Sequence, residues 1–147
     1  MSSLWKTDMF TLDAFKTFYA QLSVDTLMQL PELYDEHAVF VDPIGTVNGI
    51  QPIQHYFAQL LMHTSACHTE IEQAVEKDDH VFLTWRMRMN HPRLNRGQTI
   101  AVDGMSHLRV SDKVTYHRDY FDLGAMVYQH VPVLGFVIKR IRQRMHT

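Results

Sequence analysis

The hydrophobic period of the chain changes once, near residue 65, and this change restricts the possible fold more than any other feature. Before it, apolar residues recur mainly at helical spacing. After it, four segments alternate or are rich in β-forming residues, and short turn sequences separate them: residues 69–76, 80–90, 98–110 and 113–121. Strands joined by such short turns pair antiparallel, so we predict a four-strand meander.

Three helices and one strand are predicted before the change of period. Residues 11–23 and 51–64 place apolar side chains on one helical face. A shorter helix is predicted from Asp25 as its N-cap, and Pro31 interrupts or kinks it. The apolar run 38–41 predicts a strand. The order indicates an α+β fold in which helices pack on one face of a strongly curved sheet.

Length and composition point to one globular domain, residues 1–147. The 147 residues are 46% hydrophobic and 20% charged, and the formal charge of −2 argues against a nucleic-acid-binding protein. Cys67, the single cysteine, cannot form an internal disulfide, and no run of about 18 apolar residues predicts a membrane-spanning helix. The first residues lack the apolar segment of a signal peptide, so we expect a cytoplasmic protein.

Strand alternation assigns side chains to the two faces of the sheet. In 80–90, Trp85 and Met87 share the apolar face, whereas Arg86 and Arg88 share the other. In 98–110, Ser106 is the polar exception on the apolar face. The half-polar outer face is therefore expected to be either solvated or buried in a dimer.

The segment AVFVDPIG (residues 38–45) carries a resemblance to a known family. Together with FKTFYAQL before it and GIQPIQHYFAQLL after it, it resembles the nuclear transport factor 2-like superfamily, most closely the ketosteroid isomerase and SnoaL-like polyketide cyclase branch. The resemblance extends to about Asp122. It implies a cone, or cystatin-like α+β barrel, in which a bent antiparallel sheet wraps N-terminal helices around a deep apolar pocket. It also implies a homodimer formed through the sheet.

The same resemblance gives Asp42 a role. In the isomerase branch, the resemblance implies, the carboxylate at this position is the general base that moves a proton between carbons of an enone. An apolar pocket increases the proton affinity of a carboxylate and excludes water, and Pro43 would fix the backbone that aims it. The alternative is that Asp42 is only an Asx-type turn residue at the end of a strand.

The sequence departs from the isomerase pattern at the oxyanion hole. That family uses a tyrosine on the first helix and a protonated aspartic acid on a central strand, and Phe18 and Ser106 occupy the matching places. Tyr19 is about 100° further round the helix and would need a shifted register. Steroid isomerisation by the family mechanism is therefore disfavoured. Limonene-epoxide hydrolase, a relative by fold, needs an arginine inside the pocket, but Arg86 and Arg88 face outward.

The last predicted strand supplies further acid-base groups. Aligned with the rest of the sheet, it turns Thr115, His117, Asp119 and Phe121 inward. SnoaL-like cyclases are similar in lining the cone with polar residues of this kind. Histidine exchanges protons near neutral pH, so His117 and Asp119 are candidate proton partners of Asp42. The alternative is a structural pair in which the two side chains only satisfy each other.

The remaining candidates are pocket-lining residues, while metals and cofactors are not indicated. The expected substrate-binding residues are Phe18, Tyr19, Tyr56, Trp85, Met87, Ser106 and Phe121. The ten histidines are scattered without metal-ligand spacing, and there is no glycine-rich phosphate loop. Cys67 is expected to be a small buried filler rather than a nucleophile.

Residues 123–147 are predicted to form a C-terminal helical extension. A short helix is broken near Pro132, and the helix after it has an apolar stripe beside a basic face that includes Lys139, Arg140, Arg142 and Arg144. One interpretation is an outer helix packed on its own domain with a solvated basic face. The other is a helix that docks on a membrane surface or a protein.

The sequence thus favours a cofactor-free acid-base enzyme, of isomerase or cyclase type, that acts on a small hydrophobic carbonyl compound. Asp42 is the expected base, and His117 or Asp119 is its proton partner. The competing hypothesis is a non-catalytic module of the same fold that binds a small molecule, a lipid or a protein. Loss of both oxyanion donors favours the second hypothesis, and the inward carboxylates favour the first.

Overall fold

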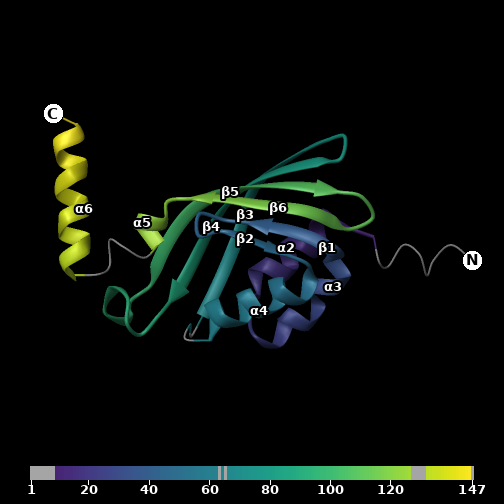
Figure 1. Cartoon of the computed structure of the whole chain (residues 1–147), viewed down its shortest axis with the longest axis horizontal. Coiled ribbons are helices and arrows are strands. Elements are labelled where there is room, and N and C mark those ends of the chain that lie inside the picture. Colours follow the sequence, from purple (N-terminus) through teal and green to yellow (C-terminus); the bar gives the residue numbers. More distant parts are fainter. Residues whose placement is uncertain (1–8, 63, 65, 127–131, 147) are drawn as a thin grey trace, which may run out of the picture.

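A six-stranded sheet and the helices on its concave face make up most of the protein (Figure 1). The computed structural model describes residues 9–62, 64, 66–126 and 132–146. The helices are α2 (Leu12–Ala20), the 3₁₀ helix η1 (Asp25–Gln29), α3 (Leu30–Leu33), α4 (Ile50–Leu61), the 3₁₀ helix η2 (Asn95–Gly97), α5 (Leu123–Met126) and α6 (Pro132–Met145). The strands are β1 (Tyr34–Val41), β2 (Thr46–Asn48), β3 (Ala66–Lys77), β4 (His80–Asn90), β5 (Ile100–Val110) and β6 (Val114–Phe121).

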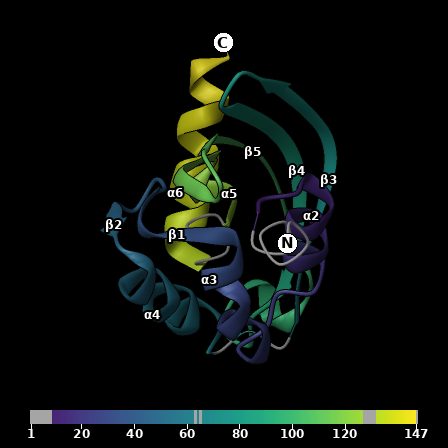
Figure 2. The same ribbon diagram turned by 90° about the vertical axis from the view of Figure 1, so that its right-hand side faces the viewer.

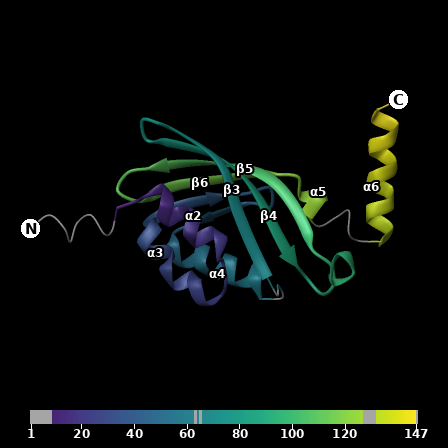
Figure 3. The same ribbon diagram turned by 180° about the vertical axis from the view of Figure 1, so that it is seen from behind.

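The strand order in the sheet is β2-β1-β6-β5-β4-β3. The predicted meander is confirmed, since β3 to β6 follow one another as antiparallel neighbours, and β1 lies parallel to β6. Seen from the end in Figure 2, the sheet curves strongly without closing. Figure 3 shows α2, α3 and α4 gathered on its concave side. The α+β cone predicted from the sequence is therefore the observed fold.

Local sequence signals account for where the two main helices begin. Thr11 caps α2, because its hydroxyl oxygen accepts a hydrogen bond from the backbone N–H of Ala14 at 3.1 Å. Gly49 precedes α4 with a φ of 92°, a conformation that favours glycine. Apolar side chains on α2 and α4, among them Phe15 and Phe57, are buried in the core.

Three details differ from the sequence-based prediction. The first strand starts at Tyr34, four residues before the predicted run 38–41, and a short edge strand, β2, pairs with β1 where no strand was predicted. Asp25 is not a capping residue: Val24 is the N-cap of η1, and the hydroxyl oxygen of Ser23 accepts a hydrogen bond from the backbone N–H of Thr26 at 3.3 Å. Pairing of β1 with β6 joins segments distant in the chain, so local propensity did not reveal it, whereas β2 is a three-residue strand in a region that reads as turns.

Thr115 was predicted to face inward, and this was wrong. The pairing of β5 with β6 is irregular at its start: Arg109 lies opposite Tyr116, but Val110 lies opposite Val114. The extra residue on β6 leaves Thr115 exposed and turns Val114 into the core. Alternation is regular from Tyr116 onward, so the inward prediction for His117 holds.

The C-terminal extension forms the two predicted helices, and α6 stands apart from the cone in Figure 1. The described side chains of α6 are exposed, including the apolar residues Phe136 and Ile141. Arg142 of α6 pairs with Asp122 at 2.5 Å. The described apolar side chains of α6 are therefore not packed on the rest of the domain. In the part of the chain that the structure describes, no helix is long and apolar enough to cross a membrane.

Candidate active site

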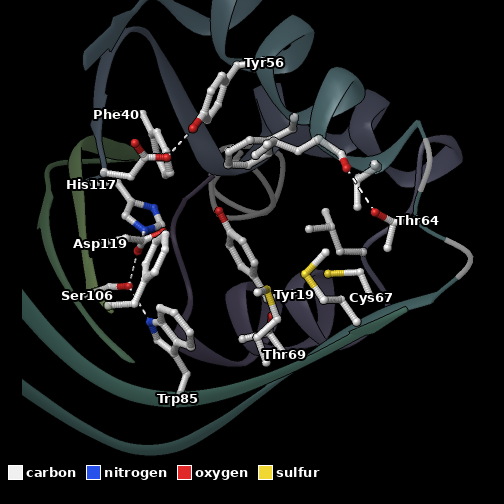
Figure 4. Close-up of a pocket in the computed structure, with 18 of the residues that line it drawn as sticks. Tyr19, Phe40, Tyr56, Thr64, Cys67, Thr69, Trp85, Ser106, His117 and Asp119 are labelled. Carbon is white, nitrogen blue, oxygen red and sulfur yellow. Dashed lines mark hydrogen bonds and ion pairs between the residues drawn. The ribbon is translucent and has the colours of Figure 1, made fainter. Parts of the chain in front are cut away.

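A mainly apolar cavity of about 140 Å³ lies between α2, α4 and the inner face of the sheet (Figure 4). Its lining residues are Phe15, Tyr19, Leu22, Phe40, Asp42, Ile44, Tyr56, Phe57, Leu60, Leu61, Thr64, Cys67, Thr69, Ile71, Trp85, Met87, Met89, Ser106, His117, Asp119 and Phe121. A dry cavity of similar volume holds a single aromatic ring in an engineered protein. The space therefore suits a small ligand.

Three titratable side chains converge on this cavity, as the sequence predicted. Asp42 reaches it from the end of β1, and His117 and Asp119 reach it from β6, which is paired with β1. Figure 4 shows His117, Asp119 and Ser106 along one wall, and Cys67 on the opposite side. No lysine or arginine is among the lining residues of this described cavity. The charged groups at the cavity are therefore the carboxylates of Asp42 and Asp119, together with His117 when its imidazole is protonated.

Asp42 is both a turn residue and a cavity residue, so the two interpretations of its sequence context are compatible. Its Oδ1 accepts backbone hydrogen bonds from Ile44 at 2.8 Å and Gly45 at 3.1 Å, which make an Asx-type turn. Its Oδ2 accepts a hydrogen bond from the hydroxyl of Tyr56, on α4. The turn and Tyr56 together fix the orientation of the carboxylate at the cavity.

His117 and Asp119 form a pair in the wall of the cavity. His117 is 2% exposed, and its Nε2 lies 2.5 Å from Oδ1 of Asp119. The same Oδ1 accepts a hydrogen bond from the hydroxyl of Ser106 at 2.5 Å. Among the described residues none donates a hydrogen bond to Oδ2 of Asp119, a side chain that is 19% exposed. This second oxygen is therefore free to meet a ligand.

Ser106 is held in place by Trp85, which explains why a polar residue occupies the apolar face of β5. The indole Nε1–H of Trp85 donates to the Ser106 hydroxyl oxygen at 2.8 Å, and Ser106 in turn donates to Asp119. Trp85 lies flat over Gly104, where an added Cβ would come within 2.4 Å of the indole ring. Glycine at 104 thus permits the close approach that brings the indole to Ser106.

Two tyrosines extend the hydrogen bonding beyond His117. Nδ1 of His117 lies 2.7 Å from the hydroxyl of Tyr34, and that hydroxyl lies 2.5 Å from the hydroxyl of Tyr19. Burial, together with the negative charge of Asp119, raises the pKa of Tyr19 well above its usual value, although the hydrogen bond with Tyr34 lowers it. Burial also raises the pKa of Tyr34. Both phenols therefore remain protonated over the physiological pH range.

Two other lining groups also stay protonated. Burial, then the hydrogen bond and charge of Asp42, raise the pKa of Tyr56 above its usual value. Burial raises the pKa of the Cys67 thiol to about 11. A thiol held neutral is a poor nucleophile, which agrees with the prediction that Cys67 is a buried filler.

Six of the seven expected substrate-binding residues line the cavity: Tyr19, Tyr56, Trp85, Met87, Ser106 and Phe121. The exception is Phe18, which is 4% exposed and belongs to the hydrophobic core. On α2 the residues that share the cavity face are Phe15 and Tyr19, four positions apart. The shifted register considered for Tyr19 is the observed one, so the first helix does present a hydroxyl.

Tyr34 is the functional candidate that the sequence analysis missed. Tyr34 precedes the predicted strand 38–41, and no local sequence pattern marks its hydroxyl as a site group. The outward prediction for Arg86 and Arg88 is confirmed, since they pair with carboxylates on the outer face. Among the described residues no three His, Cys, Asp or Glu side chains are grouped closely enough to hold a metal ion.

The curved sheet with helices on its concave face is the fold of nuclear transport factor 2-like proteins. The family model of the SnoaL-like domain matches residues 15–117, so the chain belongs to the SnoaL-like domain family. The predicted branch of the superfamily is thereby confirmed. Among curated protein sequences none matches the chain significantly.

Solved structures share this fold at low sequence identity. A ketosteroid isomerase-like protein from Catenulispora acidiphila, in complex with trimethylamine, is 21% identical with a TM-score of 0.69, covering 81% of this chain and 90% of that one. TerC, co-crystallised with polyporic acid, is 18% identical with a TM-score of 0.67, covering 78% and 93%. A protein described as a SnoaL-like polyketide cyclase from Jannaschia is 17% identical with a TM-score of 0.60, covering 70% and 74%.

Proposed function

We propose that the protein is a cofactor-free acid-base enzyme, of isomerase or cyclase type, for a small hydrophobic carbonyl compound. The observation that carries this proposal is the convergence of Asp42, His117 and Asp119 on one apolar cavity. Isomerisation and cyclisation both need a group that removes a proton and a group that returns one. Similarity to proteins described as polyketide cyclase and ketosteroid isomerase-like supports the same reaction class.

Asp42 removes the proton from the carbon next to the carbonyl group. Tyr56 and the Asx-type turn align its carboxylate, and the Tyr56 hydroxyl can remain in contact with a protonated Asp42 by acting as acceptor. When Oδ2 of Asp119 carries a proton, it gives that proton to the ligand; Asp42 then releases its proton to solvent and the His117–Asp119 pair takes one up, which restores the starting state. The two groups thus act on different parts of the bound molecule.

The ligand of this cavity is small, neutral and largely apolar. Most lining side chains are apolar or aromatic, so burial of apolar ligand surface supplies the affinity. The carboxylates and the absence of lysine and arginine from the described lining oppose an anionic ligand. Trimethylamine and polyporic acid are bound in neighbours of the same fold, which supports uptake of small organic molecules.

A direct test is exchange of hydrogen for deuterium next to a carbonyl group. The purified protein is incubated in D₂O with cyclohexanone and with 2-cyclohexenone, and deuterium incorporation is followed by NMR. Loss of a general base lowers the rate by about 10²-fold or more, so Asp42→Asn should exchange at least about a hundredfold more slowly than wild type. Asp103→Asn, which removes a surface carboxylate paired with Arg86, is the matched control and should exchange like wild type.

Native ligands are tested by purifying wild type and Asp42→Asn from the native host and identifying the released molecules by mass spectrometry. An apolar carbonyl compound enriched in Asp42→Asn supports the enzyme, because binding persists while turnover stops. A bound molecule present equally in both proteins, with no exchange activity, would instead favour the non-catalytic binding module. Full exchange activity in Asp42→Asn would contradict the role given to Asp42.

Two partner surfaces belong to the proposal. The outer face of the sheet exposes Phe82, Met105 and Tyr120 on neighbouring strands, and we expect a second copy of the chain to cover it. On α6 the exposed apolar residues stand beside Lys139 and Arg140, and we expect this helix to meet an anionic membrane surface.

A further inference from the structure

One series of hydrogen bonds begins and ends at the cavity but passes through its buried wall. It runs from Tyr19 to Tyr34 (2.5 Å), from Tyr34 to His117 (2.7 Å) and from His117 to Asp119 (2.5 Å). Tyr19 and Asp119 line the cavity, whereas Tyr34 does not and is 1% exposed. Each of these contacts holds one proton, which belongs to one partner or the other. The direction of each bond therefore constrains the next.

When the His117–Asp119 pair carries a single proton, that proton lies between Nε2 and the Asp119 carboxylate. Nδ1 of His117 then has a lone pair, so Tyr34 must donate its hydroxyl proton to it. The Tyr34 oxygen is left to accept, and Tyr19 must donate to it. In this state the Tyr19 hydroxyl offers the cavity only lone pairs, which favours a ligand that donates a hydrogen bond.

When the His117–Asp119 pair carries a second proton, the hydrogen bonds between His117 and Tyr34 and between Tyr34 and Tyr19 reverse direction. Nδ1 of His117 now carries hydrogen, whether the other proton is held by Nε2 or by Asp119. Nδ1 donates to the Tyr34 oxygen, so Tyr34 donates to Tyr19. The Tyr19 proton is then free to point into the cavity, where it can donate to a carbonyl oxygen.

We infer that the number of protons on the His117–Asp119 pair, transmitted through Tyr34, decides whether Tyr19 accepts or donates hydrogen bonds in the cavity. Tyr34 is a positioning residue, since it acts through Tyr19 and does not line the cavity. The inference rests on the proposed function only in taking the cavity as the ligand site. It adds a determinant of specificity, because a carbonyl ligand is favoured only in the doubly protonated state of the pair.

The other groups around His117 do not replace this connection. The rings of Phe15 and Phe40 pack against the imidazole and carry no exchangeable proton. The remaining titratable groups of the cavity are Tyr56 and Asp42, which bond to each other, and Cys67, which stays protonated. A change in Tyr34 leaves these groups in place, and it leaves Oδ2 of Asp119 at the cavity, so it removes only the part of the pH dependence that passes through Tyr19.

The test compares the binding of two unreactive ligands across pH. Methyl benzoate offers a carbonyl acceptor and has no hydrogen on the carbon next to the carbonyl, and ethylbenzene has a similar shape without an acceptor. Affinities are measured by calorimetry between pH 4.5 and 8.5. One neutral hydrogen bond changes affinity by about threefold to tenfold, so the ratio of methyl benzoate to ethylbenzene affinity should rise by that factor as the pH falls.

Two variants decide whether the series causes this change. Tyr34→Phe removes the connection, and its affinity ratio should vary less with pH than that of wild type, because only direct contact of the ligand with Asp119 remains. Tyr19→Phe keeps the contact between Tyr34 and His117, and its ratio should be low at every pH; it also serves if Tyr34→Phe folds poorly. A wild-type ratio that is constant with pH, or a variant that keeps the wild-type dependence, would overturn the inference.

Failure of the reaction and failure of this inference are distinguishable, since neither ligand can undergo the proposed proton transfer. If no deuterium exchange is found but the ratio of methyl benzoate to ethylbenzene affinity depends on pH, the proposed enzyme activity is contradicted and the inference is not. If neither ligand binds at any pH, the cavity is not the ligand site and the inference is overturned with it.

Discussion

Asp42 and Asp119 are both cavity carboxylates, yet their surroundings give them different chemistry. Both oxygens of Asp42 are engaged, by the turn and by Tyr56, so its orientation is fixed. Asp119 uses one oxygen for His117 and Ser106 and presents the other to the cavity. Strand alternation turned His117 and Asp119 inward, and the family resemblance placed Asp42 with them at a pocket. The sequence did not determine which oxygen bonds to which group, since that depends on distances of a few tenths of an ångström.

Cys67 supports a prediction about stability in alkali. Burial raises its pKa from 9.0 to about 11. Between these values the unfolded chain loses the thiol proton while the folded chain keeps it, so stability should fall as pH rises. Wild type should lose up to about 2 kcal/mol more than Cys67→Ala between pH 8 and pH 11. Urea unfolding at several pH values measures this difference.

The comparison cancels the contribution of the tyrosines. Tyr19, Tyr34 and Tyr56 also have raised pKa values, and they lower stability at high pH in both proteins alike. Parallel curves of unfolding free energy against pH for wild type and Cys67→Ala would contradict the raised pKa of Cys67.

Among the helices and strands, α6 is the one whose apolar residues are least explained by the side chains around it. It has no acidic residue, and its described apolar side chains are exposed. An amphipathic helix of this kind gains by burying its apolar side at a membrane surface while basic residues meet anionic headgroups. The two helices of the extension were predictable from periodicity and Pro132. Periodicity did not predict whether the apolar side of α6 packs on the domain, because that packing depends on where β6 ends.

We therefore expect the protein to bind vesicles that contain phosphatidylserine and to bind neutral phosphatidylcholine vesicles weakly. Each basic residue near such a surface contributes about 1 kcal/mol, so Arg140→Glu combined with Arg144→Glu should weaken binding more than tenfold. Lys77→Glu, at the exposed end of β3, is the control and should have little effect. Co-sedimentation measures the bound fraction, and equal binding of wild type and the double variant would exclude α6 as the contact.

At the scale of the whole molecule, the outer face of the sheet exposes aromatic side chains that the proposed reaction does not use. Phe82 and Tyr120 are 38% and 47% exposed, and the rings of His80 and His107 stack beside Phe82. A sheet face rich in aromatic side chains is typical of a protein interface. A homodimer through this face would leave the cavity open, because the cavity lies on the opposite, concave side.

Light scattering after size-exclusion chromatography tests the dimer. Wild type should elute with twice the monomer mass, and Phe82→Glu should elute as a monomer because a buried unpaired charge opposes association. Met28→Glu is a matched control, since Met28 is an exposed apolar residue on η1 (81% exposed) outside the sheet. A monomeric wild type, or a dimer that tolerates Phe82→Glu, would contradict this interface.

The sequence by itself determined the α+β class, the meander and the facing of β4 and β5, and its resemblance to the superfamily indicated carboxylates at a pocket. Hydrophobic period and short turns act over a few residues and are written directly in the chain. Only the tertiary structure decided the pairing of β1 with β6, the outward turn of Thr115 and the join between Tyr34 and His117. These features bring together segments up to 83 positions apart, and their geometry depends on how the whole sheet curves.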